Sequence, residues 1–131
     1  DRDSRLDGVP NILPSIIFSQ RIQEKASHAG FDWEGIDEVW EKLDEEINEL
    51  RFAQKENDIN KIREEIGDLL FTVINLSRFF GISAENALRG SNNKFIKRFQ
   101  LLEKIIFDMN KNINDFSPNE LDEIWKEAKK Y

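Results

Sequence analysis

The sequence predicts an all-α fold, an antiparallel helical bundle of about four core helices followed by a C-terminal helix. Apolar residues recur at the three- and four-residue spacing of a helix face over several long segments. No segment of useful length shows the period-two alternation of a strand. The 131 residues are enough to bury a core, so we expect one domain over residues 1–131, with 1–11 as an extended lead-in or linker.

Capping and breaking residues set the expected helix boundaries. Asp58 and Ser83 are good N-caps for the third and fourth helices. Gly81 should close the third helix. Ser117-Pro118-Asn119-Glu120 combines an N-cap serine, a proline at the first helical position and a glutamate at the third. The expected helices cover residues 14–30, 34–56, 59–80, 84–109 and 117–130.

Two acidic clusters organise the chain, one on the second expected helix and one on the third. They are Glu45-Glu46-Ile47-Asn48-Glu49 and Glu64-Glu65-Ile66-Gly67-Asp68. Each contains two acids three residues apart, which makes them neighbours on one helix face. The leading glutamates, Glu45 and Glu64, fall away from the apolar stripe of their helix, so we expect both to be solvated.

The remaining four acids lie at the edge of the core in a helical projection. At about 100° per residue, Glu46 lies roughly 60° and Glu49 roughly 120° from the centre of the apolar stripe. On the next helix the angles are about 80° for Glu65 and about 140° for Asp68. Each helix can therefore offer a pair of carboxylates to the same point.

Four converging carboxylates repel one another unless a cation lies between them. Oxygen ligands favour hard ions, so Mg²⁺ or Mn²⁺ is the natural occupant, with Ca²⁺ as a competitor. Acidic residues at this spacing also decorate ordinary solvated helix faces. Spacing alone leaves both interpretations open.

Composition narrows the function classes. The chain has no cysteine, which excludes disulfides and thiolate chemistry. Its net charge of −7 argues against nucleic-acid binding, and no apolar run approaches the roughly 20 residues of a membrane span. We therefore expect a cytoplasmic protein. It begins at Asp1 rather than methionine, which suits a piece of a longer protein with a further amino-terminal domain.

A basic group early in the fourth helix is a candidate phosphate site. Lys94 and Arg98 are four residues apart and can share a helix face, with Asn92 and Lys97 beside them. Lys25, near the end of the first helix, is a further candidate contact. An ordinary basic helix surface gives the same pattern.

Aromatic residues and the single histidine offer weaker signals. Phe31 and Trp33 can stack on a base, but aromatic residues more often pack in a core, where we expect Phe31. His28 has no second histidine or cysteine with which to form a zinc site. No glycine-rich phosphate loop is present.

Several motifs, in order along the chain, resemble the MazG-type all-α nucleoside triphosphate pyrophosphohydrolases. The signature is Glu45-Glu46-x-x-Glu49, then Glu65-x-x-Asp68 after fifteen intervening residues. The opening of the chain resembles the second, carboxy-terminal domain of two-domain MazG proteins. Further matching blocks are Leu6-Asp7-Gly8-Val9-Pro10, Leu13-Pro14, Gly30-Phe31-Asp32-Trp33, Gly67-Asp68-Leu69-Leu70-Phe71, Asn92-x-Lys94-Phe95-x-Lys97-Arg98-Phe99 and the last helix with Trp125. The family commonly has two arginines where this chain has Lys97-Arg98.

The resemblance implies a helical homodimer that sanitises nucleotide pools. Such an enzyme cleaves a nucleoside triphosphate between the α and β phosphates, giving the monophosphate and pyrophosphate. By this analogy the four acids at the edge of the core hold magnesium and form the catalytic centre, with Glu46 or Glu49 accepting a proton from water. The implied substrate-binding residues are Lys94, Arg98, Asn92, Lys25 and Trp33.

Other functions stay open on the sequence. A relative with a narrower substrate, such as dUTP, dCTP or phosphoribosyl-ATP, would carry the same acidic signature. A non-catalytic helical assembly module that binds a basic partner through its acidic faces would also fit. The base and sugar preference and the number of metal ions are not encoded in any single residue.

Overall fold

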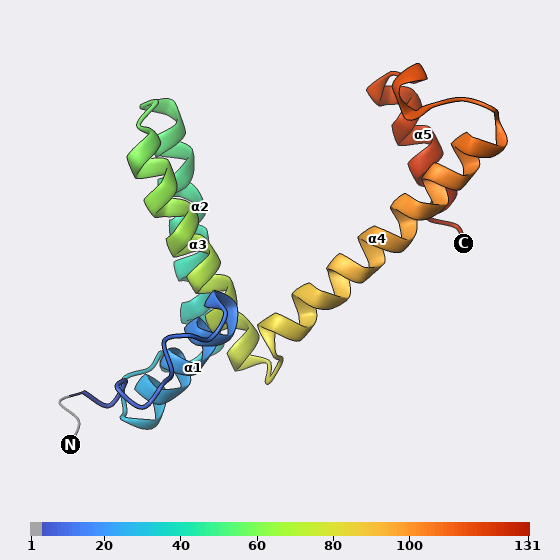
Figure 1. Ribbon diagram of the computed structural model, residues 1–131. Coiled ribbons are helices and arrows are strands. Elements are labelled where there is room, and N and C mark those ends of the chain that lie inside the picture. Colours follow the sequence, from blue (N-terminus) through green and yellow to red (C-terminus); the bar gives the residue numbers. More distant parts are fainter. Residues whose placement is uncertain (1–3) are drawn as a thin grey trace. The chain divides into compact units, whose positions relative to one another are not determined.

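The computed structural model describes residues 4–131 and contains five α-helices and one short 3₁₀ helix over that range (Figure 1). No strand occurs among these residues, so the all-α prediction is confirmed. The expected helix boundaries agree to within about two residues. The elements are α1 (Ser15–His28), α2 (Ile36–Lys55), α3 (Ile59–Phe79), α4 (Ala84–Asp108), η1 (Ile113–Asp115) and α5 (Pro118–Ala128).

The chain divides into two compact units, one ending at residue 86 and the other covering residues 87–131. Each is described by itself. The expectation of a single domain over residues 1–131 stays a prediction, and residues 1–3 of the expected lead-in lie outside the described part of the chain.

The first unit is built on a hairpin of α2 and α3, with α1 packed against α3 (Figure 1). The turn between α2 and α3 places Asn57 at φ +55°, and Asp58 caps α3 by accepting a hydrogen bond from the Lys61 backbone N–H at 3.2 Å. Asp58 was predicted as the N-cap of this helix, and the prediction is confirmed. Val39, Ala53 and Ile74 are among the buried residues of the unit. The hairpin brings the two acidic clusters onto adjacent helices.

A side chain from α1 fixes the turn after α3. Gln20 donates to the Ile82 carbonyl at 3.2 Å and accepts from the Ala84 backbone N–H at 2.9 Å. Gly81 adopts φ +69°, and Ser83 caps α4 by accepting from the Asn86 backbone N–H at 3.2 Å. The predicted helix end and cap are therefore confirmed.

The second unit has its own small core. Leu102 and Ile106 of α4 and Ile124 of α5 are buried together, and Trp125 packs against them. Ser117 and Glu120 form the predicted capping box at the start of α5. This unit therefore holds the expected last helix in place.

Apolar residues of the α3 stripe are less covered than the sequence pattern predicts. Ile59, Ile66, Leu70 and Val73 are each more than 40% exposed. The prediction that Phe31 is a core residue was wrong, because its side chain is 83% exposed. It follows the left-handed Gly30 turn (φ +97°) in the loop between α1 and α2, where no helix covers it.

Over residues 4–131, no single helix is both long enough and apolar enough to cross a membrane.

Candidate functional site

The α2–α3 hairpin brings together the four acids singled out by the sequence. Carboxylate oxygens of Glu46, Glu65 and Asp68 lie within 4.8 Å of one another. Glu46 also belongs to a second such group, with Glu49 and Glu45. Glu46 therefore links the acids of the two helices into one cluster, which we call the acidic cluster: Glu45, Glu46, Glu49, Glu65 and Asp68.

Burial within the acidic cluster follows the helical projection. Glu46 and Glu65, at the smaller angles from the apolar stripes, are only 3% and 4% exposed. Glu49 and Asp68, at the larger angles, are exposed. Glu45 is exposed as expected, yet it still reaches the other carboxylates of α2. Each helix thus contributes one buried acid and at least one exposed acid.

Each buried carboxylate is balanced by a lysine one turn earlier on its own helix. Lys42 Nζ lies 3.0 Å from Glu46 Oε1, and Lys61 Nζ lies 4.0 Å from Glu65 Oε1. The second oxygen of each glutamate, Oε2, is buried and has no hydrogen-bond partner among the described residues. Because a buried charged oxygen without a partner is costly, the cluster is incompletely satisfied by the protein alone.

The electrostatics of the cluster favour a proton or a cation. Burial first, and then the neighbouring carboxylates of Glu49 and Glu46, together raise the pKa of Glu65 from 4.5 to about 7. The hydrogen bond to Glu46 raises the pKa of Lys42. These carboxylates repel one another when all of them are ionised, so a bound positive ion is favoured at the cluster.

The residues present fit a hard divalent cation. Every donor in the acidic cluster is a carboxylate oxygen, which is the ligand type that Mg²⁺, Mn²⁺ and Ca²⁺ prefer. The two unpartnered Oε2 atoms of Glu46 and Glu65 supply unused ligands within the protein. Exposed Glu49 and Asp68 can complete the coordination from the solvent side.

A cavity of about 870 Å³ opens beside the acidic cluster. Its volume suits a small-molecule ligand of nucleotide size. The lining combines acidic, basic and aromatic side chains of α2 and α3. Its residues are Glu45, Asn48, Glu49, Phe52, Ala53, Glu56, Asp58, Lys61 and Glu65.

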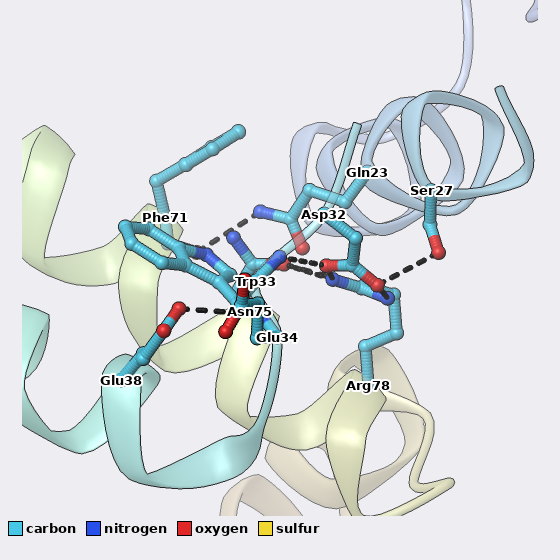
Figure 2. Close-up of polar contacts among 9 residues, drawn as sticks. All are labelled: Gln23, Ser27, Asp32, Trp33, Glu34, Glu38, Phe71, Asn75 and Arg78. Carbon is cyan, nitrogen blue, oxygen red and sulfur yellow. Dashed lines mark hydrogen bonds and ion pairs between the residues drawn. The ribbon is translucent and has the colours of Figure 1, made fainter. Parts of the chain in front are cut away.

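A second cavity, of about 410 Å³, lies between α1, α3 and the loop before α2. Figure 2 shows the polar network at its wall, centred on Asp32 and Arg78. Arg78 binds Asp32 through two hydrogen bonds, of 3.0 and 2.5 Å. Ser27 donates to the same carboxylate at 2.8 Å. The bidentate bond to Arg78 lowers the pKa of Asp32 to about 2.

Of the predicted substrate-binding residues, Trp33 lines the second cavity and is 38% exposed, and Lys25 is exposed on α1. Asn92, Lys94 and Arg98 lie on α4 in the second unit. They share the predicted helix, and their role near the acidic cluster stays a prediction. Within that unit, the Arg98 guanidinium lies 4.9 Å from the Trp125 ring centroid, a cation–π contact.

Sequence reasoning missed several residues of the site. Lys42 and Lys61 carried a usable signal, because each stands four residues before a buried glutamate. Asp32 and Arg78 are 46 residues apart, and no local pattern links them. Gln23, buried at 6% exposure on α1, gave no signal either.

Comparison with known proteins assigns the chain to a family. The model of the MazG nucleotide pyrophosphohydrolase domain matches residues 34–101, which contain the whole acidic cluster. The nucleoside triphosphate pyrophosphohydrolase/pyrophosphatase MazG of Thermotoga maritima is 39% identical over 128 residues, 98% of this chain and 49% of that protein. The nucleoside triphosphate pyrophosphohydrolase of Escherichia coli K12 is 35% identical over 97% of this chain and 49% of its own length.

The chain thus spans about half the length of these curated relatives. A shorter match, 37% identity over 70 residues, links it to the Bacillus subtilis protein named uncharacterized protein YabN, covering 53% of this chain and 14% of that protein. The chain therefore belongs to the MazG nucleotide pyrophosphohydrolase family.

Proposed function

We propose that this chain hydrolyses nucleoside triphosphates between the α and β phosphates, releasing a nucleoside monophosphate and pyrophosphate. The observation that carries the proposal is the pair of buried, unpartnered Oε2 atoms on Glu46 and Glu65. Two relatives are named nucleoside triphosphate pyrophosphohydrolases, and their likeness covers nearly the whole chain. The cofactor is Mg²⁺, with Mn²⁺ as a substitute.

Glu46, Glu49, Glu65 and Asp68 hold the cation. When bound, it supplies positive charge for the phosphate oxygens and makes water easier to deprotonate. Glu46 and Glu65 are fixed by the packing of α2 and α3, so they set the position of the phosphates relative to the protein. The exposed carboxylates face the incoming substrate.

Hydrolysis forms one new bond from the water oxygen to phosphorus and breaks the bond from that phosphorus to the bridging oxygen. The water must lose a proton in this step. Glu49 or Glu46 accepts this proton, since both carboxylates belong to the same group of ligand atoms. Lys42 and Lys61 add positive charge at the edge of the cluster, where the triphosphate arrives.

The triphosphate chain is held by Lys94 and Arg98, with Asn92 and Lys25 as further contacts and Trp33 near the nucleoside. The resemblance of the Asn92–Phe99 block to the family supports this assignment. We also propose a homodimer in the cytoplasm. The exposed apolar residues of α3 support a second subunit, because such a surface gains stability when it is covered.

The test is pyrophosphate release from the eight common nucleoside triphosphates, with magnesium, with manganese and with a chelator. We expect chelator-sensitive release matched by equal amounts of monophosphate. Hydrolysis of only one of these substrates would instead indicate a pyrophosphatase with a narrow substrate range. No release from a folded, magnesium-loaded sample would favour a helical assembly module instead.

A further inference from the structure

We propose that Asp32 and Arg78 are positioning residues, which hold Trp33 in place for the substrate without touching the substrate themselves. Trp33 stands in the loop 29–35 between α1 and α2, where it lines the 410 Å³ cavity and is 38% exposed. The inference rests on the proposed function, in which Trp33 lies near the nucleoside. It adds how a side chain on a loop is held before the substrate arrives.

The carboxylate of Asp32 is fully used by groups of the protein. An ionised carboxylate offers about four acceptor sites, and four donor groups fill them here (Figure 2). Oδ1 accepts from the Trp33 backbone N–H at 2.8 Å and from Arg78 at 2.5 Å. Oδ2 accepts from the Ser27 hydroxyl at 2.8 Å and from Arg78 at 3.0 Å. Asp32 therefore acts through the groups that it binds, and Trp33 is one of them.

The guanidinium of Arg78 is engaged on two sides. Nη1 and Nη2 donate to Asp32, while Nε and Nη2 donate to Oδ1 of Asn75 at 3.2 and 2.9 Å. Asn75 stands three residues before Arg78 on α3, so it orients the guanidinium from the same helix face (Figure 2). The side chain of Arg78 is only 14% exposed. Arg78 thus ties the loop to α3, and its donors are already occupied.

The two ends of the loop are fixed independently of this pair. The backbone N–H of Phe31 donates to a carbonyl of α1 at 2.9 Å, which holds the start of the loop. The backbone N–H of Glu34 donates to a carboxylate of α2 at 3.2 Å, which holds its end. Trp33 lies between these bonds, and its backbone N–H bonds to Asp32. Loss of the bond between Asp32 and Arg78 should therefore free Trp33 while both ends of the loop stay in place.

A tether of this kind affects substrate binding more than the chemical step. When only about a tenth of the molecules hold the Trp33 ring in place, the apparent dissociation constant for the substrate rises about tenfold. Asp32 and Arg78 are not members of the acidic cluster, so kcat should change little. The KM of Trp33→Ala sets an upper limit to the effect, because a displaced ring contributes at least as much as a missing one.

The first test compares Arg78→Met with Arg63→Met, using magnesium and ATP. Each arginine stands on α3 and donates to the asparagine three residues before it, Arg63 to Asn60 at 3.0 Å, but Arg78 also binds Asp32. We expect Arg78→Met to raise KM about tenfold and to leave kcat within about twofold, while Arg63→Met keeps both. Asp32→Asn should raise KM in the same way, and it carries the test if Arg78→Met does not fold. A wild-type KM in these loop variants would overturn the proposal.

A double-mutant cycle separates positioning from direct contact with the substrate. If Arg78 acts through Trp33, Arg78→Met should not raise KM further in a Trp33→Ala background. The loss of thermal stability caused by Arg78→Met should be similar in both backgrounds, so a merely structural role would not give this pattern. A further tenfold rise of KM in the Trp33→Ala background would mean that Arg78 contacts the substrate itself, and it would overturn the proposal.

An NMR measurement needs no turnover and separates this proposal from the proposed function. The ¹⁵N order parameter of the Trp33 backbone amide should be about 0.85 in the wild-type chain and fall below about 0.6 in Arg78→Met, while that of Phe31 stays unchanged. A rigid Trp33 amide in Arg78→Met would overturn the tether and leave the hydrolase intact. Loss of order at Trp33 in a chain whose wild type hydrolyses no triphosphate would support the tether and overturn the hydrolase.

Discussion

Lys42 Nζ lies 3.0 Å from Oε1 of Glu46, a carboxylate that is almost completely buried. The lysine balances the charge of the glutamate when no cation is present, but it reaches only one of the two oxygens. A cation bound through Oε2 would add to the charge balance that the lysine provides at Oε1. Replacing Lys42 should therefore lower the free energy of unfolding most when no cation is bound.

Lys42→Met tests how far the lysine and a cation share in balancing the Glu46 charge. In the presence of a chelator we expect the free energy of unfolding to fall by about 1 kcal/mol, because a buried carboxylate loses its partner. Added Mn²⁺ should recover most of the loss, as measured by thermal unfolding. Lys104→Met is the control, since Lys104 pairs with Asp108 at 3.7 Å on an exposed surface. Equal losses in the two variants would contradict the role given to Lys42.

Glu65 should give the metal-free protein an unusual pH dependence. Its pKa is about 7 in the folded chain and 4.5 ordinarily, so the folded state binds more protons between these values. The corresponding stability is present below pH 4.5 and is lost as the pH rises through about 7. In chelator, the melting temperature should fall over this range, and Glu65→Gln should flatten the fall. Glu64→Gln, at an exposed position, should keep the wild-type slope.

The ion pair of Asp32 with Arg78 should act in the opposite direction. The pKa of Asp32 is lowered to about 2 from 3.8, so its contribution to stability is present above pH 3.8 and is lost as the pH falls through about 2. Asp32→Asn should lower the free energy of unfolding by about 1 kcal/mol at neutral pH, allowing for partial exposure.

Chemical denaturation at pH 7 and at pH 2.5 checks this expectation, since the difference between wild type and variant should shrink in acid. Asp122→Asn is the control, because Asp122 pairs with Lys126 on an exposed face of α5. If Asp32→Asn lowered the free energy of unfolding at pH 7 by no more than the control does, the ion pair of Asp32 with Arg78 would not stabilise the fold.

Local rules were enough to predict the helices and the core of the acidic cluster. Capping at Asp58, Ser83 and Ser117 depends on residues within three positions of each other, so it can be read directly from the sequence. The contrast between buried Glu46 and exposed Glu49 follows from the angle of each residue on its helix.

Long-range contacts were not predictable in this way. Asp32 meets Arg78 across 46 residues, and Gln23 meets Phe71 across 48, so neither pairing has a periodic signal. The projection also assumes that an apolar stripe is covered. Phe31 and Leu70 show that apolar character alone does not bury a side chain in a single chain.

The most direct test of the central claim is pyrophosphate release by Glu49→Ala beside Glu64→Ala, with magnesium and ATP. Both glutamates are exposed, so both variants should keep wild-type helical content by circular dichroism. Glu49 belongs to the acidic cluster and Glu64 does not. The account predicts that Glu49→Ala loses about 100-fold or more in kcat/KM while Glu64→Ala stays close to wild type. Turnover of Glu49→Ala at the wild-type rate would contradict the assignment of the acidic cluster as the catalytic centre.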